Sequence, residues 1–192
     1  VIDSNLTTPN VGIHLGAPEV PVTLNHVLQG KAQLHEAIYE HDSGIKVVPS
    51  SLAVSELKKI KPKDIEKYKK DFSNLAEYVI VDSSAGLGEE SISSIRMADE
   101  LIVVTNPEMA AITDALKAIK LSEQSKKKIR GVIVTRVKRN KIEMEPNAVK
   151  DMLESTILGS IPEDKTVSQS WNLRDAIVHT HPKSKPARAY KE

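Results

Sequence analysis

The order of apolar and amphipathic segments predicts an α/β fold with a mostly parallel sheet flanked by helices. Short apolar runs alternate with segments of helical periodicity along most of the chain, which is typical of strand–helix–strand units. The run Tyr78-Val79-Ile80-Val81 lacks polar alternation, and such runs suit parallel strands that are buried on both faces. Because open α/β folds bind ligands at the carboxyl ends of their strands, the residues after each run are candidates for function.

The composition is that of an ordinary globular domain. A chain of 192 residues suits one domain, spanning residues 1–192, with a sizeable core. The net charge of +1, from 27 basic and 26 acidic residues, provides no global field that would attract nucleic acid or an anionic membrane. Aromatic residues are only 3%, which disfavours stacking platforms for single-stranded nucleic acid. Cysteine is absent, which excludes disulfides and thiolate-ligated metal sites. These features fit a cytoplasmic protein.

The first residues have the character of a strand end. Val1-Ile2-Asp3 places two apolar β-branched residues before an acid. Natural domains seldom open inside a buried strand, because the strand would lose ladder partners. We therefore expect further residues upstream of Val1, which makes residues 1–192 an N-terminally incomplete domain that lacks the start of its first strand.

In the first half of the chain, turn and cap residues set the bounds of the predicted elements. Thr23 suits a helix cap and Gly30 a helix stop, while Pro62 suits the first position of another helix. Helices are expected at 23–30, 32–39, 52–60 and 62–75, and strands at 45–49 and 78–82.

In the second half, helical and strand segments alternate clearly. Asn106 is expected to cap the longest helix, along which Ile112, Leu116 and Ile119 form one apolar stripe. Lysines 126–128 end this helix, where cations are favoured, so we prefer a structural role for them over nucleic-acid binding. Further helices are expected at 89–97 and 146–153, and strands at 100–105, 129–137 and 156–161.

Polar side chains follow four of the predicted strands. Asp3, Asp82 and Thr105-Asn106 end three of them, and Thr135-Arg136 lies near the end of a fourth. Parallel strands bring such ends to one edge of the sheet, where two acids suit Mg²⁺, which an Asp commonly reaches through a water. Gly86 leaves room for a phosphate to approach the backbone. Taken singly, each acid could instead cap a helix or order a loop.

Two common phosphate-binding motifs do not occur in these residues. Gly30-Lys31-Ala32 fails as a G-x-x-x-x-G-K-[ST] loop, because Ala32 lacks the hydroxyl and Asn25 stands in place of the first glycine. Gly86-Leu87-Gly88 lacks the third glycine of a dinucleotide fingerprint. Composition and spacing alone therefore lead to an α/β domain whose acidic edge suits a magnesium nucleotide.

Four motifs in this order resemble those of the MinD/ParA ATPases, most closely the archaeal MinD-like proteins. They are DSNLTTPNVG at 3–12, VDSSAG at 81–86, VTNPE at 104–108 and IPED at 161–164. The resemblance extends from Val1 to about Tyr190 and is specific through the combination of the motifs. It implies a P-loop NTPase fold, ATP or ADP with Mg²⁺, an ATP-dependent homodimer and a regulatory protein partner whose identity the sequence does not give.

The resemblance also implies roles for individual residues. Residues 3–10 match switch I and residues 82–86 match switch II, with Asp82 as the Walker B acid. Asp3, Asn5 and Asp82 are the candidate catalytic residues, and Asp82 and Asp3 are the candidate magnesium ligands. The family places its deviant Walker A loop, K-G-G-x-G-K-[ST], in the segment that would precede Val1.

The remaining assignments lie around the nucleotide. Glu108 matches a residue that reaches the partner's nucleotide across the dimer, and Asp114 resembles an interface residue. Thr135, Arg136 and residues 162–164 match the segment around adenine. The candidate nucleotide-binding residues are Asn10, Gly86, Glu108, Thr135, Arg136, Pro162, Glu163 and Asp164.

This sequence departs from the family pattern at three places. Asn5 stands where the family often has a second acid near the attacking water, and an amide cannot accept a proton as a carboxylate does. Ser84 replaces a common proline in the switch II turn. Residues 183–192 lack the apolar face of the membrane-binding helix that ends bacterial MinD proteins, which leaves peripheral contact with the membrane open.

Two functions of different classes fit these observations. The first is an ATP-binding, ATP-hydrolysing switch that positions a cellular structure in cell division or partition, with slow turnover because of Asn5. The second is a non-catalytic adaptor that keeps the fold and binds a partner without turnover. Asp3, Asp82 and Glu108 favour the first, and Asn5 favours the second. Metal-carrier relatives need bridging cysteines, which this sequence lacks.

Overall fold

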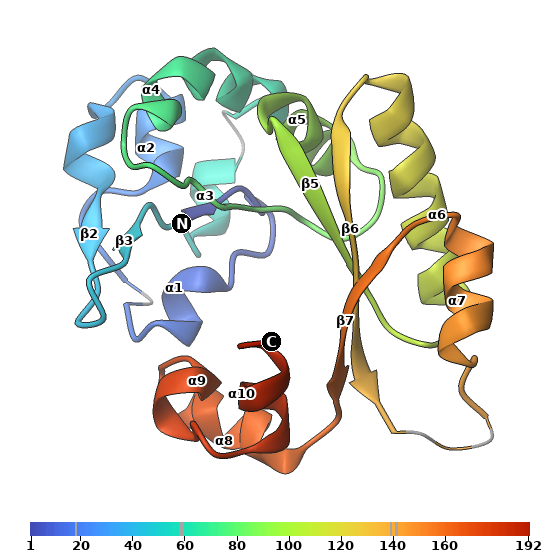
Figure 1. Cartoon of the computed structure of the whole chain (residues 1–192). Helices are drawn as coiled ribbons and strands as arrows, with labels where there is room; N and C mark the ends of the chain where they lie inside the picture. The colour runs from blue at the N-terminus through green and yellow to red at the C-terminus, as the bar shows by residue number, and fades with distance from the viewer. Residues whose placement is uncertain (18, 58–59, 139, 141) are drawn as a thin grey trace. The chain divides into compact units, whose positions relative to one another are not determined.

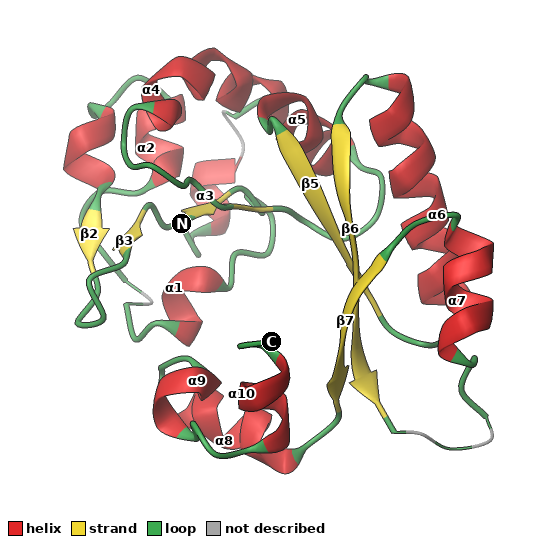
Figure 2. Cartoon of the chain, in the orientation of Figure 1, coloured by secondary structure: helices red, strands yellow, loops and turns green. Residues whose placement is uncertain are grey.

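The chain forms two compact units, Val1–Ala98 and Asp99–Glu192. A computed structural model describes residues 1–17, 19–57, 60–138, 140 and 142–192 (Figure 1). Both units combine strands with helices, and parallel pairing links β1 to β4 and β5, β6 and β7 to one another (Figure 2). The predicted α/β class with parallel sheets flanked by helices is therefore confirmed.

Short strands form the centre of the first unit. β1 (Ile2–Asp3) pairs in parallel with β4 (Val81–Asp82), so that Asp3 lies opposite Asp82. β2 (Tyr39–Glu40) and β3 (Lys46–Val47) form an antiparallel hairpin. A parallel bridge joins Ile2 to Val48, just after β3. The predicted strand end at residues 1–3 and the strands at 45–49 and 78–82 are present, although each is shorter than expected.

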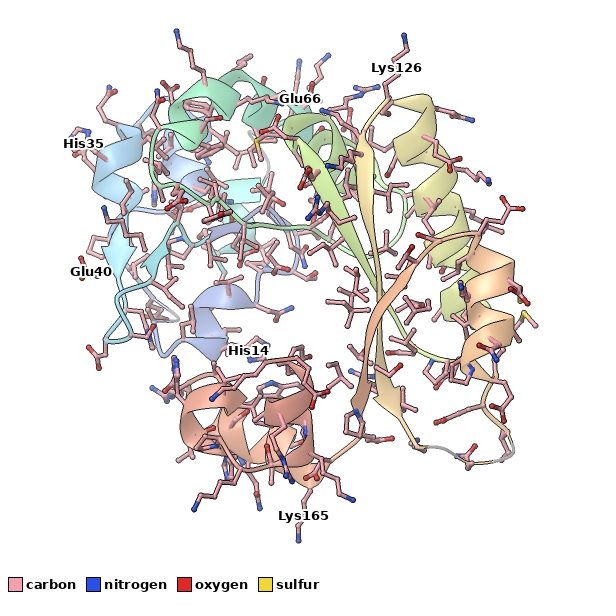
Figure 3. All side chains as sticks on the ribbon, in the orientation of Figure 1. His14, His35, Glu40, Glu66, Lys126 and Lys165 are labelled. Carbon is pink, nitrogen blue, oxygen red and sulfur yellow. The ribbon has the colours of Figure 1, made fainter. Side chains whose placement is uncertain are left out.

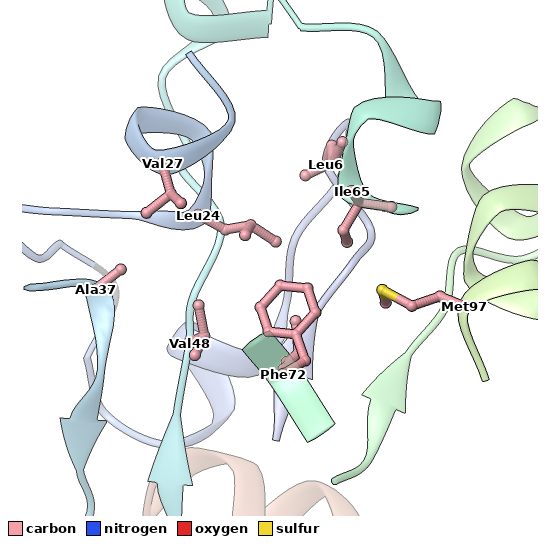
Figure 4. Close-up of a cluster of buried hydrophobic side chains, with 9 residues drawn as sticks. Leu6, Leu24, Val27, Ala37, Val48, Ile65, Phe72 and Met97 are labelled. Carbon is pink, nitrogen blue, oxygen red and sulfur yellow. The ribbon is translucent and has the colours of Figure 1, made fainter. Parts of the chain in front are cut away.

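Helices surround these strands and supply the core of the first unit. Buried side chains from β1, α2, η2, α4 and the end of α5 meet in one cluster, which Figure 4 shows around Phe72. The helical elements of this unit are α1 (Val11–His14), α2 (Leu24–Leu28), η1 (Leu34–Ala37), α3 (Val54–Leu57), η2 (Pro62–Tyr68), α4 (Lys69–Ser73) and α5 (Glu89–Met97).

Several helix predictions in this unit need correction. The helix expected at 32–39 is only the short 3-10 helix η1, because Ile38 and Tyr39, with their preference for strands, lead into the hairpin instead. The helix expected at 62–75 is divided into η2 and α4, and α1 was not predicted. Of the helix expected at 52–60, α3 is the observed part, and residues 58–59 lie outside the described residues. Thr23 and Gly30 do flank α2 as predicted.

The strand β4 is not covered on both faces. Val79 and Val81 pack against the core of the first unit, but Tyr78 is 81% exposed and Ile80 is 63% exposed. The two pairs point to opposite sides, as the alternation of a strand requires. The continuous apolar run therefore predicted the strand correctly, while the predicted burial of both faces does not describe these residues.

The second unit is built on a three-stranded parallel sheet in the order β5-β6-β7. β5 (Glu100–Thr105) and β7 (Ile157–Pro162) lie on either side of β6 (Lys128–Val137). α6 (Met109–Gln124) and α7 (Pro146–Leu153) cover one face of the sheet (Figures 1 and 2). The strands expected at 100–105, 129–137 and 156–161 and the helices at 89–97 and 146–153 match the observed elements within a residue.

The start of α6 differs from the prediction. The residue at the cap position is Glu108, not Asn106. Asn106 instead accepts a hydrogen bond from the Thr135 hydroxyl at 3.0 Å, so its side chain is used between strand ends. The predicted apolar stripe of α6 is confirmed, because Ile112 and Ile119 are buried and Leu116 packs against the same cluster. Figure 3 shows Lys126 just beyond the end of this helix.

Three short helices follow β7 and were not predicted. They are α8 (Lys165–Asn172), α9 (Ile177–Thr180) and α10 (Lys185–Ala189), and α10 contacts β7. Asp164 caps α8 by accepting a hydrogen bond from the Thr166 N–H at 2.9 Å. Among the residues that the structure describes, no helix has both the length and the apolar character required to cross a bilayer.

The apolar stripe of α6 provides a test of the second core. Ile112→Ala should lower the free energy of unfolding by about 2–5 kcal/mol, because Ile112 is fully buried and its removal leaves a cavity. Met109→Ala, at a 60% exposed position of the same helix, should change it far less. Urea unfolding followed by circular dichroism measures both, and equal losses would contradict the assigned orientation of α6.

Candidate functional site

Asp3 organises the loop that follows β1. Its side chain is fully buried, and it accepts hydrogen bonds from the backbone N–H groups of Asn5, Asn10 and Val11 at 3.2, 3.1 and 3.1 Å. One carboxylate oxygen receives the bond from Asn5, and the other receives both remaining bonds. The loop 4–10 is therefore closed onto the strand end by a single acid, and Asn10 takes part through its backbone.

The environment of Asp3 opposes its ionisation. Burial raises the pKa of the Asp3 carboxyl to about 6, and the negative charge of Asp82 adds to this rise. The three N–H donors act in the opposite direction, because they stabilise the carboxylate. Desolvation is the largest of these effects, so Asp3 holds a proton more readily than an exposed aspartate does.

Asp82 lies opposite Asp3 but has a different environment. More than a third of the residue is exposed, yet partial desolvation of its carboxyl still raises the pKa of Asp82, while the nearby charge of His14 lowers it. His14 ends α1, as Figure 3 shows. Within the described part of the chain, no hydrogen bond to the Asp82 carboxylate is found. This carboxylate is therefore available for a ligand, whereas that of Asp3 is already engaged.

The turn after β4 leads directly into α5. Gly86 has a φ of 79°, a left-handed conformation that glycine adopts without strain, and a Cβ added there would meet nothing within 4 Å. Gly88 occupies the cap position of α5. The backbone around Gly86 is thus open, as a phosphate-binding turn requires, and Asp82 lies at the start of this turn.

Asn5 is used inside its own loop. Its amide N–H₂ donates to the Thr8 carbonyl at 2.7 Å, and its amide oxygen accepts hydrogen bonds from the Thr8 N–H and hydroxyl at 3.2 and 3.1 Å. Both ends of the amide therefore order the turn between Asn5 and Thr8. A carboxylate could keep the two accepted bonds but could not donate to the carbonyl.

The residues fit a magnesium site in part. The free carboxylate of Asp82 at a strand end is the kind of group that holds Mg²⁺, directly or through a water. Asp3 has one of about four lone-pair positions left after its three hydrogen bonds, so its present geometry suits ordering the loop better than direct ligation. In the described part of the chain, no group of three or more His, Cys, Asp or Glu is placed to hold a metal ion.

In the second unit, the other predicted site residues lie at the carboxyl ends of the parallel strands. The Thr135 hydroxyl, near the end of β6, reaches the Asn106 side chain after β5. Val137 lies opposite Pro162, and the Glu163 N–H donates to the Val137 carbonyl at 3.0 Å. Residues from the three strand ends are therefore adjacent, as the parallel topology predicts.

Individual contacts refine the roles of these residues. Arg136 is exposed and has a φ of 56°, an uncommon left-handed conformation for a residue with a side chain. Glu163 pairs with Lys138 at 3.1 Å. Hydrogen bonds from Thr166 hold the pKa of Asp164 below its usual value, in agreement with its role as a helix cap. Asp114 is exposed on α6 and pairs with Lys117 at 3.4 Å.

The sequence reasoning missed the residues that attach the loop 4–10 to α5. The Ser4 hydroxyl lies 2.8 Å from that of Ser94, and the Thr7 hydroxyl donates to the Glu90 carboxylate. Serines and threonines are frequent in this sequence, so the residue types alone do not indicate these contacts. The one indication in the sequence is that Glu90 and Ser94 are four residues apart, which places them on the same face of a helix.

Comparison with known proteins decides the family. The protein-family model ParA, described as an NUBPL iron-transfer P-loop NTPase, matches residues 65–192. An ATP-binding protein of Methanocaldococcus jannaschii is 36% identical over 192 residues, which cover 100% of this chain and 73% of that protein. This chain belongs to the ParA family of P-loop NTPases. The resemblance to MinD/ParA ATPases that the four motifs predict is thereby confirmed.

Solved structures of ParA-family members named MinD share the fold of this chain. The septum site-determining protein MinD of Pyrococcus horikoshii, solved in complex with Mg-ADP, has a TM-score of 0.93 and 29% identity, covering 98% of this chain and 78% of that one. MinD in the MinC:MinD complex of Aquifex aeolicus has a TM-score of 0.80 and 25% identity, covering 94% and 74%. A P-loop NTPase fold is therefore established for this ParA-family chain.

The description of the ParA family model names iron transfer, which is a statement about the family model and not about this chain. The 192 residues contain no cysteine, so they supply no thiolate for an iron–sulfur cluster. The acids at the ends of β1 and β4 are oxygen ligands, which hard cations such as Mg²⁺ prefer.

The raised pKa of Asp3 predicts how stability depends on pH. The folded pKa of about 6 lies above the unfolded value of 3.8, so folding is favoured by protonation. This contribution is fully present below about pH 4 and is lost as the pH rises through about 6, a change of up to about 3 kcal/mol. Urea unfolding between pH 4 and 7 should show a smaller decline in stability for Asp3→Asn than for the wild type.

An exposed acid of the same unit provides the control for this measurement. Asp42→Asn makes the same chemical change at an exposed position and serves as the control variant. An unchanged decline in Asp3→Asn would show that Asp3 does not titrate in this range. A general loss of stability that is equal at every pH would instead reflect its lost hydrogen bonds.

Proposed function

We propose that this chain acts as an ATP-dependent switch of the MinD/ParA type. It binds ATP with Mg²⁺, forms a dimer around the nucleotide, hydrolyses it slowly, and positions a cellular structure in division or partition. The observation that carries the proposal is the pair of acids at paired strand ends, where Asp3 closes a loop and Asp82 is left free beside an open glycine turn.

The two acids have distinct parts in this proposal. Asp82 holds Mg²⁺, directly or through water, and the backbone around Gly86 accommodates a phosphate. Asp3 holds the amides of Asn5, Asn10 and Val11, so it fixes the loop that matches switch I. Magnesium neutralises phosphate charge when it is bound. The predicted role of Asp3 as a second magnesium ligand stays a prediction.

The second unit supplies the proposed adenine and dimer contacts. Thr135, Arg136 and residues 162–164 form the polar end of the sheet, which matches the family segment around adenine. Glu108 is at the cap position of α6, and Asp114 lies in the first half of that helix, where it is exposed and suits contact with a second subunit. MinD in the MinC:MinD complex has a protein partner, and we extend to this chain only a regulatory partner of unknown identity.

The cellular placement in this proposal is cytoplasmic, with peripheral contact with the membrane as a further possibility. The proposal includes no specific nucleic acid, because the 27 basic and 26 acidic residues nearly balance. It names no particular cargo. The phosphate-binding loop K-G-G-x-G-K-[ST] remains a prediction for the full-length protein.

One observation favours the second function, a non-catalytic adaptor. Asn5 donates and accepts hydrogen bonds within its loop, so its amide is committed to the Thr8 turn rather than presented toward a water. A loop stabilised in this way can serve as a fixed recognition surface without turnover. ATP binding with no measurable hydrolysis would support the adaptor.

The first test concerns Asp82. In the full-length protein, Asp82→Ala should weaken ATP binding about tenfold or more in the presence of Mg²⁺ and change it little in EDTA, because the removed carboxylate acts through the metal. Titration of a fluorescent ATP analogue under both conditions measures this. Asp71→Ala, an exposed acid on α4, is the control and should bind as the wild type does. Equal affinities for Asp82→Ala and the wild type in Mg²⁺ would remove Asp82 from the site.

The second test separates slow turnover from no turnover. In the full-length protein, Asn5→Asp should raise steady-state phosphate release at saturating ATP, because a general base typically contributes about 10²- to 10⁴-fold. The gain will lie below this range, since the new carboxylate loses the 2.7 Å bond to the Thr8 carbonyl and repels it.

The companion variant for this test is Thr8→Ala, which removes the hydroxyl that bonds Asn5 but adds no base. It should not raise turnover. If Asn5→Asp binds ATP and dimerises as the wild type does but releases phosphate no faster, Asn5 is not the cause of slow hydrolysis.

A further inference from the structure

Two side-chain contacts attach the loop 4–10 to α5. The hydroxyls of Ser4 and Ser94 lie 2.8 Å apart, and the Thr7 hydroxyl donates to the Glu90 carboxylate. Glu90 and Ser94 are four residues apart on α5, so they lie on the same face of the helix. One side of α5 therefore contacts the loop at two points, one helical turn apart.

The direction of the first contact follows from counting protons. The Asp82 carbonyl can only accept, so the Ser4 hydroxyl donates to it at 2.6 Å, and the Ser4 N–H donates to the same oxygen at 2.9 Å. The Ser4 hydroxyl has one proton, which this bond uses, so in the contact with Ser94 the Ser4 oxygen can act only as an acceptor. The Ser94 hydroxyl also lies 2.8 Å from the Glu90 carbonyl, which competes for the single proton of Ser94.

This chain of hydrogen bonds is sheltered from water. Ser4 is 2% exposed and Ser94 is 4% exposed. A buried hydroxyl that loses its partner is costly, because no solvent molecule replaces the bond. The link from α5 through Ser4 to the end of β4 is therefore shielded from solvent.

The same helix begins at the glycine turn that follows Asp82. Gly88 is at the cap position of α5, and the Ile92 N–H donates to the Gly88 carbonyl at 3.0 Å. A displacement of the turn 83–88 consequently moves the first turn of α5, which carries Glu90 and precedes Ser94. The loop that these residues hold contains the amides of Asn5 and Asn10 that bind Asp3.

We infer that Ser94 and Glu90 are positioning residues that set the geometry of the Asp3 loop relative to Asp82. They transmit the state of the turn 83–88 to the loop 4–10 through one face of α5. The importance of this coupling for a nucleotide switch rests on the proposed function, whereas the coupling itself is a property of the chain without ligand.

Hydrogen exchange of the ligand-free full-length protein tests the coupling. The reporters are the N–H groups of Asn10 and Val11, which donate to Asp3. Ser94→Ala should speed their exchange about 2- to 10-fold, the factor expected from one lost hydrogen bond. Ser91→Ala is the matched control, because Ser91 is also buried on α5 but its hydroxyl donates to the Gly88 carbonyl at 3.3 Å and not to the loop.

The exposed contact gives a second test that does not disturb the core. Glu90→Ala should also speed exchange at Asn10 and Val11, while Glu90→Gln should restore slow exchange because its amide oxygen still accepts from Thr7. Glu89→Ala, one residue earlier, should have no effect. If Ser94→Ala and Glu90→Ala exchange as their controls do, the inference is overturned.

Adding Mg-ATP separates this inference from the proposed function. Binding should slow exchange at Asn10 and Val11 in the wild type, and this protection should be weaker in Ser94→Ala and Glu90→Ala than in Ser91→Ala. Full protection in all variants would overturn the role of this coupling in the response to nucleotide. If the variants alter exchange without ligand but the wild type binds no nucleotide, the positioning role is supported and the proposed function fails.

Discussion

A single buried carboxylate holds together the part of the first unit on which the candidate site depends. Asp3 is fully buried and accepts three backbone N–H bonds, and these define both the loop 4–10 and the start of α1. Burial of a carboxylate is unfavourable unless hydrogen bonds compensate. The balance is incomplete here, because desolvation still raises the pKa of Asp3 to about 6. Burial of the Asp3 carboxylate thus lowers the stability of the folded state, while its three hydrogen bonds define the geometry of the loop 4–10.

Parallel pairing explains why this constraint bears on function. The register of β1 and β4 places Asp3 opposite Asp82, so the buried and the free carboxylate share one edge. One carboxyl of this pair is buried and the other is exposed, although the two residues lie opposite each other. In the second unit the same topology gathers Asn106, Thr135 and Pro162 at three adjacent strand ends. Strand direction, more than any single motif, decides where polar groups meet.

The sequence predicted the elements that have strong local signals. Strong apolar strands, the α6 stripe and Pro146 at the start of α7 were located correctly, because periodicity and cap residues determine them locally. The sequence failed where tertiary contacts decide. Asn106 has the character of a helix cap, but its partner is the Thr135 hydroxyl, which lies 29 residues away in the sequence. The small helices α8 to α10 lack long apolar stripes and depend on packing such as that of α10 on β7.

The site shows the same division between local and tertiary information. Asp3 and Asp82 could be named from their places after apolar runs, but their unequal burial could not, because it depends on the loop that closes over one of them. Asn5 is the sharpest case. In the sequence motif, Asn5 stands where the family often has an acid. In the structure, both the N–H₂ group and the oxygen of its amide form hydrogen bonds with Thr8 and order the turn.

These two descriptions of Asn5 are linked by a physical trade-off. An amide can donate to the Thr8 carbonyl and so stabilise the loop, whereas a carboxylate offers a base but repels that carbonyl. The loop 4–10 is bonded to Asp3 at the end of β1 and to Glu90 and Ser94 on α5. These hydrogen bonds restrain it more than a loop that must rearrange freely. The amide of Asn5 adds a further restraint through its hydrogen bonds to Thr8. For the function proposed above, such a loop would favour a long-lived bound state over rapid turnover, and the proposed switch and adaptor would then differ in the rate of one step rather than in the architecture of the site.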